Sequence, residues 1–457
     1  MSSLKKDFAK VAGSNVLLLL ASTLNNFVLP IVLSITDYAN YKTYILYVGF
    51  AGLFHLGYVD GINIKYGGKD LKELDNRVFW NEHHFFLLIQ LLVSSVLLIA
   101  AFLSRSLILG LFAVSIIPIN MQSFFLFFLQ AVGQFSIYAK SFIVVPVLMS
   151  ITTCLVFAFH IPCGYLLFCI VYACCYVVSW ALLEWRTIKV FGFSRHFEIK
   201  DNLSNHSAIF QSGFFIMMGT IVFGFFSTIG QWLIKWNMDD EAFAIFSMAA
   251  SLLGFVLVFV NAVNKVFYPF LCRNRENNES HQLLIDVLVF LSTMSLPFYY
   301  ILELCINLIL PKYSAAIGIV KLLLLTLPAI IIIQSYYINL YKAKRMERLY
   351  LRDGIMYTLV AILINAIALF LFNSIKVVAI ATALCSYIWF FFPNRQIYVF
   401  KERIRLATYL VLVFAVYLLS DYLSLGLAVS FMVSFLGILA INLAFYRKTI
   451  VSKVLNK

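Results

Sequence analysis

Long apolar runs, separated by short polar gaps of which every second one is basic, constrain this chain more than any single motif. Each run is close to the roughly 20 residues with which a helix spans the hydrocarbon core of a bilayer. The sequence therefore predicts an all-α polytopic membrane protein with about fourteen transmembrane helices. Twelve or thirteen spans are the alternative, because two of the divisions are weak. The runs lie near 11–34, 42–64, 80–103, 107–132, 141–160, 163–184, 207–232, 242–264, 283–309, 314–341, 354–372, 376–394, 405–420 and 424–446.

The 34 Lys and Arg residues fix the predicted orientation. Nearly all of them lie in alternate gaps, which identifies those gaps as cytoplasmic because translocated loops shed basic residues. Both termini are then predicted to be cytoplasmic. The net charge of +13 is spread over short loops, which suits contact with anionic membrane lipids and argues against binding of nucleic acid. The exceptions are Lys42, Arg105, Lys235, Lys312 and Lys376 at the outer edges and Lys321 inside a run.

Composition agrees with a chain that is solvated by lipid. Hydrophobic residues make up 63% and charged residues 12%, against about 45–50% and about 25% in soluble domains. The 8 cysteines lie mostly within the runs and show neither a CxxC pair nor a zinc-type spacing. We therefore expect no metal site, no cofactor and no disulfide framework.

The longest central polar segment, near residues 185–207, divides the runs into six, six and two. This plan predicts an N-terminal lobe over residues 1–195, a C-terminal lobe over 196–400, and a two-helix tail with a cytoplasmic end over 401–457. Similar acidic turns follow the first run of each half, at Asp37 and at Asp239-Asp240-Glu241, which favours duplicated halves. Such repeats are typical of alternating-access transporters, whose substrate site lies between the lobes near the membrane midplane.

Several short segments resemble the polysaccharide transporter family of the MOP flippase superfamily, which includes Wzx-type flippases of O-antigen and capsule repeat units. The segments are Leu29-Pro30-Ile31-Val32-Leu33, Leu56-Gly57-Tyr58-Val59-Asp60-Gly61-Ile62, Val266-Phe267-Tyr268-Pro269-Phe270-Leu271, Tyr313-Ser314-Ala315-Ala316 and Asn339-Leu340-Tyr341-Lys342-Ala343. In the second segment the Gly and Asp are rearranged relative to the family pattern. The resemblance implies two six-helix lobes of MOP or MATE type. It also implies translocation of an undecaprenyl-diphosphate-linked oligosaccharide across a bacterial inner membrane.

Two ionisable residues lie well inside predicted spans, where a charge costs several kcal/mol unless it is paired. Glu303 precedes Pro311 by eight residues, and Lys321 follows it by ten. Their similar depth on consecutive antiparallel helices leaves two interpretations open. One is a structural ion pair. The other places Lys321 in the substrate cavity, facing the diphosphate or an acidic sugar, with Glu303 as a proton-coupling carboxylate.

Amide side chains form the second group of candidate cavity residues, because amides both donate to and accept from sugar hydroxyls. Each amide alone is also compatible with a helix–helix hydrogen bond. Lys42 and Lys235 occupy equivalent outer positions in the two halves, as interfacial anchors or as a pair that holds an anionic substrate. The amide candidates are Asn25, Asn26, Gln211, Gln231, Asn261 and Asn264.

The predicted function is therefore a flippase, with no catalytic residues. Its expected partners are the lipid-linked glycan, membrane lipids, a coupling proton or sodium ion, and polymerase and chain-length components of the same pathway. Three alternatives remain: a multidrug or cation antiporter, a lipid II-type flippase, and a membrane glycan polymerase. The antiporter usually needs a carboxylate buried in the N-terminal lobe, and no carboxylate lies in the middle of a predicted span there. The polymerase needs an acid–base group in a sizeable outer loop, and every predicted outer loop is short.

Overall fold

The computed structural model describes residues 20–195, 203–393, 395–396, 403–422 and 426–450, and within them it contains helices and no strand. The chain forms two compact units, Met1–Phe225 and Phe226–Lys457. Each predicted apolar run meets a helix or a broken helix, the first run only over its described part. Nine helices of the described residues are long and apolar enough to cross a membrane, or eleven with two bent pairs. The count of fourteen and the orientation stay predictions.

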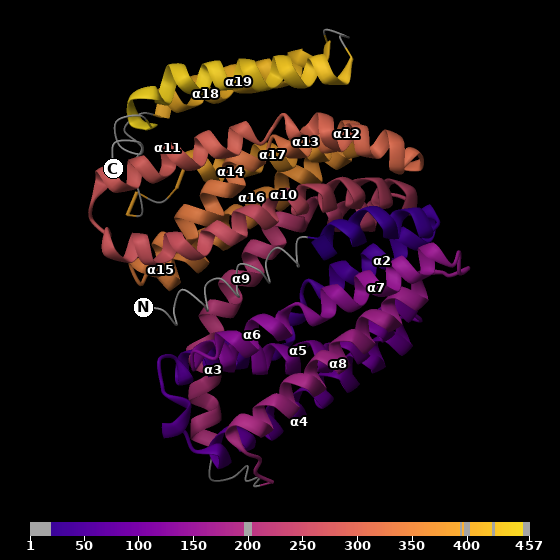
Figure 1. Ribbon diagram of the computed structural model, residues 1–457, viewed down its shortest axis with the longest axis vertical. Helices are drawn as coiled ribbons and strands as arrows, with labels where there is room; N and C mark the ends of the chain where they lie inside the picture. The colour runs from indigo at the N-terminus through magenta and orange to yellow at the C-terminus, as the bar shows by residue number, and fades with distance from the viewer. Residues whose placement is uncertain (1–19, 196–202, 394, 397–402, 423–425, 451–457) are drawn as a thin grey trace. The chain divides into compact units, whose positions relative to one another are not determined.

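The first unit begins with a helix at Leu20–Val32 and continues through the first part of α9 (Figure 1). Polar residues in the predicted gaps cap its helices: the Ser34 hydroxyl accepts from the Asp37 N–H, and the Asp75 carboxylate from the Arg77 N–H. The elements are α2 (Ile35–Val48), η1 (Ala51–His55), α3 (Tyr58–Tyr66), η2 (Leu71–Glu73), α4 (Asn76–Leu103), α5 (Leu107–Ala131), α6 (Phe135–Phe142), α7 (Val144–Ala158), α8 (Tyr165–Phe191) and α9 (Leu203–Asn237).

Helices α4, α5 and α8 pack side by side in this unit, with α5 in contact with both of the others (Figure 1). An aromatic core that includes Phe79, Trp80, Phe124 and Phe128 fills the space near one end of these helices. The second predicted span is broken: the segment Ile35–His55, which comprises α2 and η1, meets α3 at 58°, where Leu56 and Gly57 adopt left-handed backbone angles.

Helix α9 approaches α3 backbone to backbone. A Cβ atom added to Gly61 would collide with the backbone of Ile209, and one added to Gly213 with the backbones of Gly57 and Gly61. Side chains reinforce this junction. The fully buried Glu82 accepts from Lys65, from the Tyr66 hydroxyl at 2.8 Å and from the Asn205 amide at 2.9 Å. These contacts hold the first half of α9 against α3 and α4.

The second unit holds the rest of α9 and the elements that follow it. Its tenth predicted span bends by 46° between α13 and α14, just before Pro328, and continues through a π-helical turn. The elements are α10 (Asp240–Arg273), α11 (Asn278–Met294), α12 (Phe298–Ile309), η4 (Pro311–Tyr313), α13 (Ala316–Leu324), α14 (Leu327–Ile332), the π-helix η5 (Ile333–Tyr337), α15 (Ile338–Ala343), α16 (Glu347–Phe372), α17 (Ile375–Phe391), α18 (Arg403–Tyr422) and α19 (Leu427–Ile450).

The last two helices, α18 and α19, form a hairpin that packs on α11 and α12 (Figure 1). Buried polar groups hold it there. The Tyr409 hydroxyl donates to Asn442 Oδ1 at 2.7 Å and is hydrogen-bonded to Thr293 Oγ1, also at 2.7 Å. The Tyr300 hydroxyl is bonded to Ser420 Oγ at 2.6 Å. The hairpin is thus joined to the unit by specific contacts as well as by apolar packing.

Candidate functional site

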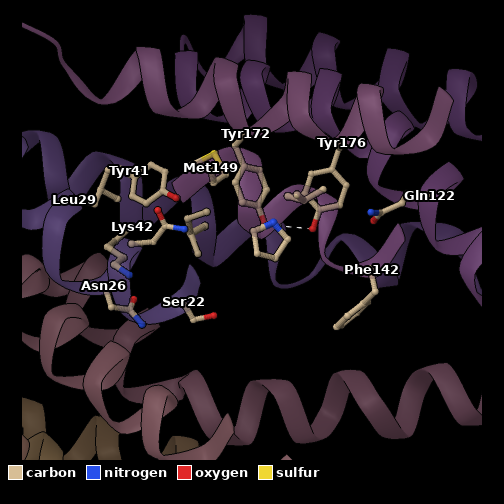
Figure 2. A pocket seen from close by; sticks show the side chains of 14 residues that line it. Ser22, Asn26, Leu29, Tyr41, Lys42, Gln122, Phe142, Met149, Tyr172 and Tyr176 are labelled. Atoms are coloured by element: carbon tan, nitrogen blue, oxygen red, sulfur yellow. Dashed lines mark hydrogen bonds between the residues drawn. The ribbon is translucent and has the colours of Figure 1, made fainter. Parts of the chain in front are cut away.

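A cavity of about 390 Å³ lies in the first unit (Figure 2). Its lining combines polar side chains that can bind a hydroxylated ligand with an apolar wall. The polar lining residues are Ser22, Asn25, Asn26, Tyr41, Lys42, Gln122, Tyr172 and Tyr176, and the apolar ones are Leu29, Ile45, Phe142, Val145, Pro146 and Met149.

Helical periodicity explains why these residues meet at one place. Ser22, Asn25, Asn26 and Leu29 follow the i, i+3, i+4, i+7 spacing of a single face of the first helix. Tyr172 and Tyr176 are four residues apart on α8, and both side chains point into the cavity in Figure 2. Helices α2, α5, α6 and α7 contribute the remaining walls. The polar face of this otherwise apolar first helix is thus the face that lines the cavity.

Asn25 is held in place from α7. Its amide Nδ2 donates to Ser150 Oγ at 3.2 Å, and its Oδ1 accepts from Thr153 Oγ1 at 3.0 Å. A primary amide has two N–H groups and two carbonyl lone pairs. Each end of this amide therefore keeps capacity for a ligand while its orientation is fixed.

The tyrosines form a continuous phenolic surface. The hydroxyl oxygens of Tyr172 and Tyr176 are 3.4 Å apart, and their ring centroids are 5.1 Å apart. The edge of Tyr44, whose hydroxyl is bonded to Ser115, packs against Tyr172 with centroids 5.8 Å apart. This support limits the rotamers of Tyr172 and so preorganises the surface that it offers to a ligand.

Among the residues of the described structure that line the cavity, Lys42 is the only charged one. Because α2 begins at Ile35, Lys42 lies about 10 Å along the helix axis from its start, at about 1.5 Å per residue. It is half-buried, and its Nζ is 5.2 Å from the centroid of the Tyr38 ring. A cation at this position gives the cavity a preference for anionic groups.

The structure places the paired candidates Glu303 and Lys321 elsewhere, on the adjacent helices α12 and α13 of the second unit. The Lys321 ammonium donates to the Leu418 carbonyl at 3.4 Å and lies over the Tyr299 ring, 5.7 Å from its centroid. Lys321 therefore contacts the α18–α19 hairpin. Its role toward a substrate, and that of Glu303, stay predictions.

The other candidates are distributed along the chain. Lys235 forms an ion pair with Asp240 at 2.7 Å. Gln211 is exposed on α9 and donates to Ser207, and Gln231 is half-buried farther along the same helix. Asn261 and Asn264 lie in α10, and their side chains are outside the described part of the structure. The structure thus brings together Asn25, Asn26 and Lys42 from the predicted set.

Sequence analysis missed the tyrosines of α8 as site residues. The available signal was the spacing of Tyr172 and Tyr176, which places two phenols on one face of an apolar helix. The described residues also contain no group of three His, Cys, Asp or Glu side chains suited to a metal ion.

Comparison with known proteins agrees with this architecture. A family model described as "Polysaccharide biosynthesis protein" matches residues 4–275. No curated protein sequence matches the chain. Among solved structures, the lipid II flippase MurJ in an inward closed conformation superposes with a TM-score of 0.70 at 15% identity, covering 97% of this chain and 99% of that one.

Two further structures extend the likeness to transporters. A MATE protein in complex with MaL6 has a TM-score of 0.57 at 11% identity, covering 97% of each chain. A MOP superfamily transporter from Pyrococcus furiosus has a TM-score of 0.54 at 12% identity, covering 96% of each chain. At these identities the likeness establishes the fold. The predicted all-helical, multi-pass membrane fold of MOP type is confirmed.

Proposed function

Because the chain belongs to the polysaccharide biosynthesis protein family, we propose that it is a flippase for an undecaprenyl-diphosphate-linked oligosaccharide. The substrate would be an O-antigen or capsule repeat unit, moved across a bacterial inner membrane. Alternating access would proceed by rocking of the two predicted lobes, residues 1–195 and 196–400, with residues 401–457 as an accessory tail. A proton or sodium ion would supply the driving force. The fold, shared with MOP superfamily transporters, supports this class of mechanism.

The observation that carries the proposal is the chemistry of the cavity in the first unit. Amides and phenols that donate and accept hydrogen bonds surround a single lysine, and none of the described lining residues is a carboxylate. Sugar hydroxyls need donors and acceptors at close spacing, and an anionic lipid-linked glycan needs a compensating cation. The cavity offers both within one helix bundle.

The same chemistry favours transport of an anion over two of the alternatives. A cation exporter would be expected to present an acidic group to its substrate, and the cavity presents a basic one. A glycan polymerase would need an acid and a base within reach of the reacting bond, and the described lining residues include no Asp, Glu or His. These arguments favour transport of an anion without catalysis.

A lipid II-type flippase is the second candidate, favoured by a specific observation. The likeness to the lipid II flippase covers nearly the whole of both chains. Lipid II is itself a lipid-linked glycan, so the two candidates differ in the sugars and not in the mechanism. The family match to polysaccharide biosynthesis favours the oligosaccharide repeat unit.

The test is the leaflet position of the lipid-linked glycan in host cells with and without the protein. Inverted and right-side-out membrane vesicles would be treated with an impermeant glycosidase. We expect the glycan to accumulate on the cytoplasmic face only when the protein is missing. If the repeat unit crosses normally while lipid II accumulates, the second candidate replaces the first. If the leaflet position of both lipids is the same with and without the protein, the flippase proposal is wrong.

Substitutions of Lys42 test in the same assay whether the positive charge of the cavity is needed for transport. Loss of one ion pair of about 1.4 kcal/mol lowers binding about tenfold, so Lys42→Gln should reduce transport by at least that factor. Lys42→Arg keeps the charge and should retain most of the activity. Lys376→Gln removes an exposed lysine at the start of α17 and serves as the control that leaves transport unchanged.

A further inference from the structure

The cavity of the first unit also indicates which part of the substrate it holds. We propose that it binds a sugar of the glycan that carries a single carboxylate, and that the diphosphate lies outside it. The inference rests on the proposed function and narrows it to acidic glycans. It is argued from the charge, the donors and the size of the cavity (Figure 2).

Charge is the first argument. A diphosphate that links a lipid to a sugar carries two negative charges, one on each phosphate. Lys42 supplies one positive charge, and it is the one charged residue among the described residues of the lining. A diphosphate would therefore retain an uncompensated charge within a helix bundle, which is costly in low-dielectric surroundings. The single negative charge of one carboxylate is neutralised by the single positive charge of Lys42.

The geometry of the donors is the second argument. Phosphate groups are typically recognised by arginine forks or by the free N–H groups at a helix N-terminus. The described lining contains no arginine, and Lys42 lies about two turns after the start of α2, where the backbone N–H groups already serve the helix. A diphosphate in this cavity would thus rely on the point charge of one lysine for two phosphates, whereas a single carboxylate needs only that one charge.

The remaining lining suits the sugar ring itself. Asn25, with its orientation fixed by Ser150 and Thr153, faces the same cavity as the phenols of Tyr172 and Tyr176. These groups both donate and accept, as ring hydroxyls require, and the aromatic faces can cover the C–H face of a pyranose. The arrangement combines one anion site with several hydroxyl sites.

Size is the third argument. Ligand pockets span about 300–1,000 Å³, and this cavity, at about 390 Å³, lies near the lower limit. It is suited to a small part of the substrate, such as one or two sugar rings, and not to a full repeat unit with its diphosphate. The carboxylate-bearing sugar is the part whose chemistry fits all three observations.

The test uses the full-length protein in lipid nanodiscs, with saturation-transfer NMR to detect weak binding. The probes are methyl glucuronide, methyl glucoside and inorganic pyrophosphate, each at millimolar concentration. We expect the glucuronide to bind about tenfold more tightly than the glucoside, the effect of one ion pair of about 1.4 kcal/mol. Pyrophosphate should not displace the glucuronide. This arm needs no variant, so it does not depend on the folding of a mutant.

Variants then test whether Lys42 causes the preference for the glucuronide over the glucoside. Lys42→Met should bring the two sugars to equal affinity while glucoside binding persists, which shows that the pocket is folded. Lys42→Arg should keep the preference, and Lys376→Gln should leave it unchanged. Equal binding of both sugars to the unaltered protein, binding of neither sugar, or displacement of the glucuronide by pyrophosphate would each overturn the inference.

The cell assay described above separates this inference from the proposed function. One outcome is that the leaflet position of the lipid-linked glycan does not depend on the protein, while the glucuronide preference depends on Lys42. The flippase function then fails and the assignment of the pocket stands. If flipping is observed without any preference for an acidic sugar, only the assignment of the pocket fails.

Discussion

At the scale of single residues, several buried polar side chains of this apolar chain form clusters in which they are hydrogen-bonded to one another. Glu82 is fully buried and accepts from Lys65, Tyr66 and Asn205. Removing one partner of a buried ion pair leaves the other charge uncompensated. The cluster therefore stabilises the junction of α3, α4 and α9 only as long as it is complete.

Glu82→Gln should lower the free energy of unfolding by about 2–3 kcal/mol, because the Lys65 ammonium loses its counter-charge. The double variant Lys65→Met/Glu82→Met should recover part of this loss, since it removes both charges. Glu241→Gln alters an exposed carboxylate in the first turn of α10 and is the matched control. Thermal unfolding in detergent measures all three, and an unchanged midpoint for Glu82→Gln would contradict the assignment.

Sequence reasoning at this scale found Asn25, Asn26 and Lys42 because amides and a cation stand out in apolar runs. It did not find Tyr172 and Tyr176, since 25 tyrosines are present and most positions are compatible with packing or with the membrane interface. Whether a tyrosine on a helix faces a cavity depends on the neighbouring helix, which the local pattern does not encode.

At the scale of elements, the close approach of α3 and α9 depends on glycine. Gly213→Ala places a Cβ against the backbone of Gly57 and Gly61 and should destabilise the protein by about 1–3 kcal/mol, the usual cost of overpacking. Gly254→Ala is the control: it lies in α10 with open space around the added Cβ and should be neutral or slightly stabilising. Equal unfolding midpoints for the two variants would show that the contact tolerates a side chain.

The helices themselves were predictable from hydropathy, whereas their breaks were not. The run at 42–64 is predicted as a single span, yet the segment Ile35–His55 and α3 meet at 58°, where Leu56 and Gly57 adopt left-handed angles. In the run at 314–341, Pro328 marks the bend, but the π-helical turn at Ile333–Tyr337 carries no signal in the hydropathy pattern. Such breaks are set by packing and by side chains such as Tyr387, whose hydroxyl donates to the Leu325 carbonyl.

At the scale of the whole molecule, the α18–α19 hairpin belongs to the second compact unit. Deletion of residues 401–457 would leave Thr293 without Tyr409 and Asn442, and Tyr300 without Ser420. We expect the truncated chain to be lost from membranes by proteolysis, and co-expression of residues 401–457 as a separate chain to restore it. Normal membrane levels of the truncated protein would show that the hairpin is an independent appendage.

The first compact unit extends to Phe225, past the polar segment near residues 185–207 where the predicted lobes divide. The lobe boundary stays a prediction, while packing joins the first half of α9 to α3 and α4. The partners of each helix follow from glycine contacts and buried polar pairs between segments more than 100 residues apart. The order of spans along the chain does not contain this information.

The central claim is that this protein moves a lipid-linked glycan across a bilayer. The most direct measurement uses the purified protein in liposomes that contain the glycan lipid in both leaflets, with an impermeant glycosidase outside. We predict that cleavage proceeds beyond the outer leaflet to nearly all of the lipid, and that Lys42→Gln slows this second phase at least about tenfold. Cleavage that stops at the outer half, as in liposomes without protein, would contradict the account.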